Sequence, residues 1–125
     1  MYKMCKTEQS AVRQRQMEEG LLNVMLTKHY DEISVSDLCD HIGIPRKSFY
    51  RYFSSKDGAL HALIDHTLLE YEGFQIPEKN HRIRTYQTDL ERFFGFWLLQ
   101  KPLLDALERS GISGMLVTRS IDHAL

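Results

Sequence analysis

The sequence contains little cysteine: two of its 125 residues, Cys5 and Cys39, carry thiols. They form no CxxC pair, and a chain of this length can bury a core without disulfides, so we expect both thiols to stay reduced and to serve no metal or redox site. No stretch of about 18 apolar residues occurs, and Lys3 and Lys6 interrupt the N-terminus where a signal peptide has its apolar core. These absences predict a cytoplasmic protein without a membrane span or a secretion signal.

Neither sign of charge is in excess, because the formal net charge is −1 at pH 7. Proteins that bind nucleic acid attract its phosphates through clustered Lys and Arg, so this balance alone does not favour such a partner. The distribution of the charges changes that conclusion. Residues 46–56 contain four cations and no acid, namely Arg46, Lys47, Arg51 and Lys56. The sequence therefore predicts one local basic patch on an otherwise balanced globular domain.

No strand pattern competes with the helical one, since β-branched residues alternate with polar ones only in short runs such as residues 33–36. Apolar residues instead return every three or four positions, which predicts an all-α fold. We expect a first long helix over residues 10–28 and a connection between two units over residues 73–81, where Gly73 and Pro77 interrupt the pattern. The other predicted helices cover residues 34–42, 45–53, 56–71, 83–100, 103–109 and 112–125.

Two of these helices are short and lie on either side of a tight turn. Ser34, with Asp37 three positions later, forms a capping-box pair that predicts the start of the first helix. Gly43 predicts its end, because glycine adopts the left-handed conformation after a helix without a steric penalty. Pro45 suits the start of the second helix, where the first N–H would have no partner in any case. Such a pair is typical of a helix-turn-helix, in which the second helix enters the major groove of DNA.

The second helix of this pair has two opposed faces. Phe49 and Phe53 are four residues apart and share one face, whereas Lys47 and Arg51 share nearly the opposite face. We expect the phenylalanines to pack inward and the cations to stay accessible. Arg and Lys side chains can donate to O6 and N7 of guanine, and hydroxyl groups suit phosphate oxygens. The accessible face therefore predicts a DNA-reading surface.

The stretch ISVSDLCDHIGIPRKSFYRYFSSKDGAL, residues 33–60, resembles the DNA-binding head of the TetR family of bacterial regulators. The resemblance covers about residues 10–71. Its most specific part is the run of residues 43–53 followed by Lys56, which is similar to the recognition helix of that family and the start of the helix after it.

The sequence departs from the family pattern at three positions. His29 stands where the family usually has a helix-ending Gly, Cys39 where a small Ala is usual, and Pro45 where a Ser cap is common. The matching positions imply contacts with DNA. Backbone contacts are implied for Val35, Ser36, Tyr50, Tyr52 and Lys56, and base contacts for Arg46, Lys47, Ser48 and Arg51.

Beyond residue 71 the resemblance implies a helical region that binds a small effector and forms a symmetric dimer. It divides the chain into a helix-turn-helix DNA-binding domain, residues 1–55, and a connecting helix with an effector-binding and dimerisation region, residues 56–125. Such regions usually continue for several more helices, so the chain is expected to be truncated. The candidate effector site is an aromatic stripe, for which packing in a core or against a partner is the alternative. It contains Phe93, Phe94, Phe96 and Trp97.

The resemblance implies a ligand-responsive repressor. It would bind a palindromic double-stranded DNA operator as a homodimer and leave it when a small-molecule effector binds, with no cofactor and no membrane partner. A protein-interaction or ligand-sensing helical module that keeps the helix-turn-helix without using it on DNA is the alternative.

An enzyme is not expected. Asp65 beside His66 and Ser110 near Asp105 come without a nucleophile elbow or a Gly-rich phosphate loop. His61 and His66 are five residues apart, which is not the i, i+4 spacing of a metal pair on one helix face.

Overall fold

The computed structural model describes residues 7–74 and 86–124, and across these ranges it contains seven α-helices and one short 3₁₀ helix without any strand. The all-α fold predicted from the spacing of apolar residues is confirmed. Cys5, the predicted helix start near Ile83 and most of the predicted connection over residues 73–81 lie outside the described residues. None of the helices in the two described ranges is long and apolar enough to cross a lipid bilayer.

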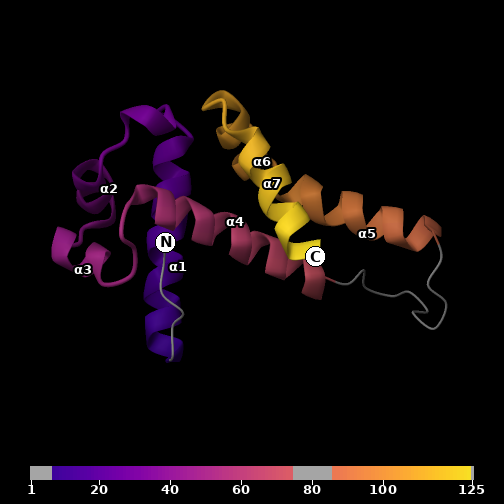
Figure 1. Ribbon diagram of the computed structural model, residues 1–125, viewed down its shortest axis with the longest axis horizontal. Helices are drawn as coiled ribbons and strands as arrows, with labels where there is room; N and C mark the ends of the chain where they lie inside the picture. The colour runs from indigo at the N-terminus through magenta and orange to yellow at the C-terminus, as the bar shows by residue number, and fades with distance from the viewer. Residues whose placement is uncertain (1–6, 75–85, 125) are drawn as a thin grey trace.

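The N-terminal part is built on one long helix, α1 (Glu8–Met25), with α2 (Val35–Ile42) packed against it and α3 (Arg46–Tyr50) packed against α2 (Figure 1). Thr7 caps α1 by accepting a hydrogen bond from the N–H of Ser10 at 3.1 Å, so the helix begins two residues before its predicted start. A 3₁₀ helix, η1 (Tyr30–Glu32), connects α1 to α2.

His29 precedes η1 in an extended conformation, with φ −63° and ψ 139°, and its Nδ1 accepts from the N–H of Asp31. The position therefore requires no left-handed φ, and a histidine can replace the glycine that the family usually has there.

The helix α4 (Lys56–Gly73) crosses α1 and leads from the helix-turn-helix to the remaining helices (Figure 1). Ser55 caps α4 by accepting from the N–H of Gly58. The chain continues with α5 (Tyr86–Leu99), α6 (Lys101–Arg109) and α7 (Ser113–Ala124), of which α6 contacts α1 and α7 contacts α4. Pro102 lies in the first turn of α6, which begins two residues before its predicted start, and Gly111 follows that helix with φ 70°.

One hydrophobic core runs through both parts of the chain. A fully buried Leu or Phe contributes about 1.5–3 kcal/mol relative to an exposed position. The division of the chain into residues 1–55 and 56–125 stays a prediction, since one core includes residues from both parts. The largest fully buried residues of this core are Leu21, Met25, Ile33, Leu38, Phe49, Phe53, Leu60, Ile64, Leu103 and Leu107.

Helices α1 and α2 approach each other closely at Gly20. A Cβ atom added to Gly20 would lie 2.5 Å from Cγ1 of Ile42 on α2, which is closer than carbon atoms can pack. Glycine at this position therefore sets how near α2 lies to α1.

Two carboxylates are buried beneath the helices, and each has a cationic or imidazole partner. Glu18 of α1 is 0% exposed, and its carboxylate lies 2.8 Å from Nδ1 of His66 and 3.0 Å from the guanidinium of Arg15. Asp65 of α4 accepts two hydrogen bonds from the guanidinium of Arg119 of α7, both at 2.5 Å. Removing one member of a buried ion pair typically costs about 3–5 kcal/mol. These contacts therefore hold α4 against both α1 and α7.

Candidate nucleic-acid interface

The turn between α2 and α3 has the geometry that the sequence predicts. Ser34 accepts from the N–H of Asp37 at 3.0 Å, and the Asp37 carboxylate accepts from the N–H of Ser34 at 3.1 Å. Gly43 has φ 84° in the left-handed region, and the N–H groups of Gly43 and Ile44 both donate to the carbonyl of Cys39. The predicted capping box and the predicted glycine stop are both confirmed.

The helix α3 is shorter than predicted at both ends. Pro45 is the N-cap, with φ −69° and ψ 150°, and the last helical residue is Tyr50 rather than Phe53. The reason lies in the hydrogen bonds after Tyr50. The N–H groups of Arg51 and Tyr52 donate to carbonyls three residues earlier, which tightens the coil into a turn. The chain stays coiled through this turn, because the N–H of Phe53 still donates to the carbonyl of Phe49 at 3.1 Å.

The inward face of α3 is the one that carries the two phenylalanines. Phe49 is 0% exposed and Phe53 is 1% exposed, and their ring centroids are 5.3 Å apart. Both rings belong to the hydrophobic core. The predicted inward orientation of Phe49 and Phe53 is therefore confirmed.

The outward face of α3 carries the cations. Arg46, Lys47 and Arg51 are exposed, and no carboxylate in the described ranges forms an ion pair with any of them. Tyr50 is 52% exposed and Ser48 is half-buried, so both hydroxyl groups lie on or beside the same surface. Free cations beside hydroxyl donors on a short, accessible helix are the chemistry that contacts base edges and phosphates.

The remaining predicted contact residues lie at the margins of this surface. Ser36 is exposed in the first turn of α2, whereas the neighbouring Val35 packs partly against the core. Tyr52 is half-buried and also packs against the core, with its ring 6.4 Å from that of Phe53. Of the three, Ser36 alone is exposed, whereas Val35 and Tyr52 are half-buried.

Lys56 opens α4 and is engaged with Tyr30. Its Nζ donates to the carbonyl of Tyr30 at 2.8 Å and lies 4.3 Å from the centroid of the Tyr30 ring. The Tyr30 hydroxyl donates to Asp57, and burial together with this carboxylate raises the pKa of that hydroxyl far above its ordinary range. Sequence reasoning missed this use of Tyr30, because the contact joins positions 26 residues apart.

Two further groups of the helix-turn-helix have shifted pKa values. The hydrogen bond from the Ser34 N–H, followed by that from Lys28, lowers the pKa of Asp37, so the capping carboxylate stays ionised. Burial raises the pKa of the Cys39 thiol. A thiol held in its protonated form is a poor nucleophile and a poor metal ligand.

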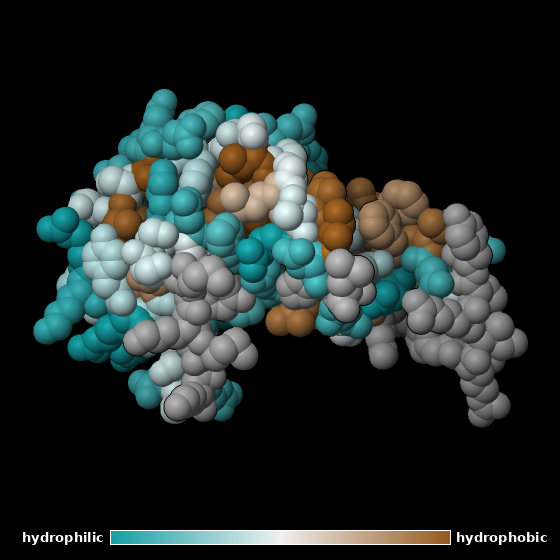
Figure 2. All heavy atoms as spheres, viewed as in Figure 1, coloured by the Kyte–Doolittle hydropathy of each residue, from teal (hydrophilic) through white to brown (hydrophobic). Residues whose placement is uncertain are grey.

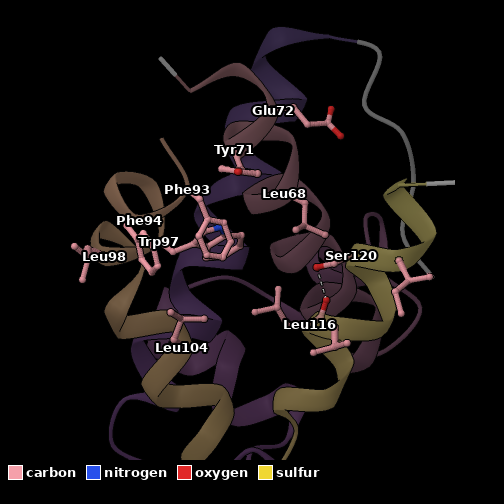
Figure 3. A pocket seen from close by; sticks show the side chains of 12 residues that line it. Leu68, Tyr71, Glu72, Phe93, Phe94, Trp97, Leu98, Leu104, Leu116 and Ser120 are labelled. Carbon is pink, nitrogen blue, oxygen red and sulfur yellow. Dashed lines mark hydrogen bonds between the residues drawn. The ribbon is translucent and has the colours of Figure 1, made fainter. Parts of the chain in front are cut away.

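A pocket of about 760 Å³ lies among α4, α5, α6 and α7. Three residues of the predicted aromatic stripe, Phe93, Phe94 and Trp97, line it from α5 (Figure 3). The other walls are mostly apolar and come from helices that the sequence reasoning did not connect with the stripe. They are formed by Leu68, Tyr71 and Glu72 of α4, Leu98 of α5, Leu104 of α6, and Leu116, Val117, Ser120 and Ile121 of α7.

Phe96, the fourth residue of the stripe, is not part of the pocket lining. It is 3% exposed, and its ring packs 5.2 Å from Tyr71 and 5.4 Å from Phe74. The reason is helical geometry: at about 3.6 residues per turn Phe96 lies beyond Phe93, on the side away from the other pocket residues of α5, so its ring turns from the pocket toward Phe74. Phe96 therefore fits the alternative given for the aromatic stripe, which is packing in a core.

Comparison with known proteins places the helix-turn-helix in a described family. Residues 20–63 match the family of bacterial regulatory proteins named tetR. A segment of 39 residues is 54% identical to the HTH-type transcriptional regulator EthR of Mycolicibacterium smegmatis. That segment covers 31% of this chain and 18% of the relative, so the similarity concerns a small part of that protein. No solved structure matches the chain.

Proposed function

We propose that this chain, whose residues 20–63 match the tetR family of bacterial regulatory proteins, is a transcriptional repressor that binds DNA. It would bind a palindromic operator as a homodimer and dissociate from it when a small molecule fills the pocket between α4 and α7. Its function is then binding rather than catalysis.

The observation that carries this proposal is the division of α3 into a buried aromatic face and an exposed cationic face. Phe49 fixes the helix to the core, while Arg46, Lys47 and Arg51 point away from it without ion-pair partners in the described ranges. Arginine and lysine donors read guanine in the major groove. We therefore assign base contacts to Arg46, Lys47, Ser48 and Arg51 and a backbone contact to Tyr50, with Val35, Ser36, Tyr52 and Lys56 at the margins.

The homodimer is supported by apolar side chains that the single chain leaves uncovered. Leu98 is 74% exposed and Leu99 is 68% exposed on α5, while Val117 and Ile121 are 61% and 56% exposed on α7. Figure 2 shows apolar side chains gathered over α5, α6 and α7, whereas the side with α2 and α3 is mostly hydrophilic. Apolar surface of this kind marks an interaction site. A dimer would bring two copies of α3 to half-sites about 34–36 Å apart.

The effector site is supported by the form and chemistry of the pocket. Its volume of about 760 Å³ lies within the range of small-molecule sites, about 300–1,000 Å³. Its walls are apolar and aromatic apart from Glu72 and Ser120, so it suits a largely apolar molecule. Leu68 and Tyr71 of α4 line it, and α4 begins five residues after Arg51. One helix therefore connects the pocket with the DNA-reading surface.

Selection of bound sites from random double-stranded DNA tests the proposal. We expect the unchanged protein to enrich a palindrome with two half-sites, which would report specificity and dimerisation together. Arg51→Ala should enrich a sequence in which one position of each half-site is no longer specified. Recovery of no common sequence would refute operator binding, and recovery of one unrepeated half-site would refute the dimer.

The alternative is a helical interaction module that does not use its helix-turn-helix on DNA, which the exposed Leu98 and Leu99 favour. Salt separates the two functions. DNA binding through phosphates weakens steeply with salt, whereas an interface built on apolar side chains hardly responds.

A further inference from the structure

Tyr30 is a buried tyrosine whose backbone and side chain contact two other elements. It lies in η1, between α1 and α2, and is 5% exposed. Its hydroxyl donates to Asp57 in the first turn of α4 at 2.5 Å, and its carbonyl accepts from Lys56 at 2.8 Å. Its N–H donates to the hydroxyl of Ser110, at the end of α6, at 3.0 Å. Tyr30 therefore joins the turn before α2 to the start of α4 and the end of α6.

The ammonium of Lys56 is held inside this junction. Besides its hydrogen bond to the carbonyl, Nζ lies 4.3 Å from the centroid of the Tyr30 ring, and the side chain is half-buried. A cation over an aromatic face is attracted to it, and more strongly where little water surrounds it. Moving the ammonium to a DNA phosphate would disturb both contacts. Lys47 and Arg51 are exposed on α3 and can reach a phosphate without such a loss.

Arg109, the residue before Ser110, strengthens the connection to α6. Its guanidinium donates to the carbonyl of Met25 at 3.3 Å and to that of Leu26, at the C-terminal end of α1. Carbonyls at a helix C-terminus have no partner within the helix, and a cation there interacts favourably with the helix dipole. Ser110 is 5% exposed, so its hydroxyl meets the N–H of Tyr30 largely shielded from water. Two adjacent residues at the end of α6 thus hold the segment on which Lys56 rests.

The start of α4 affects the orientation of α3, because residues 51–55 alone separate the two helices. Within this segment Phe53 is 1% exposed, and Ser55 caps α4 by accepting from Gly58. A segment anchored in the core and at the cap has little freedom to absorb a movement of α4. A displacement of Lys56 relative to Tyr30 would therefore be passed on to Arg51.

We infer that Tyr30 and Lys56 are a positioning pair for DNA binding rather than a phosphate contact. The pair holds the first turn of α4, and with it the exposed face of α3, in one orientation, and Ser110 makes that orientation depend on the position of α6. The inference rests on the proposed function. It gives Lys56 a different role from the backbone contact that its place in the sequence implies.

Lys56→Gln, compared with Lys47→Gln, tests the pair on the duplex that the unchanged protein selects. Glutamine keeps an N–H that can donate but removes the charge. We expect Lys56→Gln to weaken binding by about fivefold or more while the slope of log affinity against log salt stays unchanged. Lys47→Gln removes an exposed cation from the DNA-reading face, where its charge also neutralises phosphate, and should lower that slope by up to about 0.9. A slope lowered by about 0.9 in Lys56→Gln, or an unchanged affinity, would overturn the inference.

Ser110→Ala keeps the test decisive if Lys56→Gln does not fold. It removes one buried hydroxyl at the C-cap of α6, and its control, Thr118→Ala, removes a hydroxyl that donates to the Gly114 carbonyl within α7 at 3.0 Å. Binding is measured at a temperature at which circular dichroism shows each variant fully folded. We expect Ser110→Ala to weaken binding by about fivefold and Thr118→Ala to leave it unchanged. Equal affinities for the two variants would contradict the coupling to α6.

Failure of the proposed function gives a different result from failure of the positioning role. If the unchanged protein selects no duplex, both are wrong. If a duplex is selected and Arg51→Ala loses affinity for it while Lys56→Gln and Ser110→Ala do not, the positioning role alone is wrong.

Discussion

The helix-turn-helix and the helices α5 to α7 differ in how far their apolar side chains are exposed. In the helix-turn-helix the large apolar residues, such as Leu38 and Phe49, are fully buried, and exposed positions carry mainly charge and hydroxyl groups. In α5 and α7 the exposed positions include Phe94, Leu98 and Ile121. The first region therefore buries its large apolar side chains without a partner, and its surface is suited to a charged partner. The second has apolar surface that a ligand or a second copy of the chain would cover.

The largest expected difference between the two regions concerns stability. Phe49→Ala removes a side chain that is 0% exposed and should cost about 3–5 kcal/mol of unfolding free energy. Phe94→Ala, at a position 58% exposed, should change that free energy by no more than about 0.5 kcal/mol. Chemical denaturation followed by circular dichroism measures both. Similar losses for the two variants would show that Phe94 is covered in solution.

A smaller difference is expected in DNA affinity. Arg51→Ala should cost about 1–3 kcal/mol on the preferred duplex and relax base choice at one position. Lys101→Ala is the matched loss of one exposed cation, here one that pairs with Asp105 on α6, and should leave the affinity unchanged. Titrations with the preferred duplex and with variants of it measure both. An equal loss for Arg51→Ala on every duplex would contradict base reading.

The capping box of α2 is expected to contribute about 1 kcal/mol. Ser34→Ala removes the hydroxyl that accepts from the N–H of Asp37, so the unfolding free energy of the helix-turn-helix should fall by about this amount. Ser34→Asp restores an acceptor at the N-cap and should recover most of the loss. If Ser34→Asp is as unstable as Ser34→Ala in thermal unfolding, capping is not the cause.

The smallest expected effect is a pH dependence of the folding stability, which arises from His61 beside α7. Nδ1 of His61 is buried without a hydrogen-bond partner in the described residues. Burial, followed by the charge of Arg119, lowers the pKa of this histidine. The charges of Asp57 and Asp65 oppose this shift. The unfolded chain, with a His pKa of about 6.5, then binds more protons than the folded one as the pH falls. The stability that His61 contributes is therefore present above about pH 6.5 and is lost below it.

Thermal unfolding between about pH 7.5 and 5.5 measures this contribution. We expect the midpoint of the unchanged protein to fall more steeply over this range than that of His61→Gln. Parallel curves for the two proteins would remove His61 as the cause.

The parts of the structure that follow local rules could be predicted from the sequence. Ser34, Asp37 and Gly43 act on backbone groups within a few residues, so their roles are visible in the spacing alone. The opposed faces of α3 follow from the helical repeat in the same way. The end of α3 was predicted three residues too late, because the tightening after Tyr50 depends on hydrogen-bond geometry that apolar spacing does not record.

The contacts between distant segments could not be predicted. The N–H of Tyr30 meets the hydroxyl of Ser110, 80 positions away, and Asp65 pairs with Arg119, 54 positions away. No spacing rule connects such positions, since their meeting depends on how α4 and α6 cross α1. For the same reason the aromatic stripe of α5 was identified without the α4 and α7 walls of the pocket.

By itself the sequence determined the all-α class, the helix-turn-helix and the two faces of its second helix, because these depend on hydrogen bonds and side-chain directions within one or two turns of helix. Tertiary structure alone decided that Lys56 rests on Tyr30, that Phe96 faces the core, and that four helices enclose a pocket. These features depend on which helix faces meet, and that is set by the packing of the whole core rather than by any local pattern.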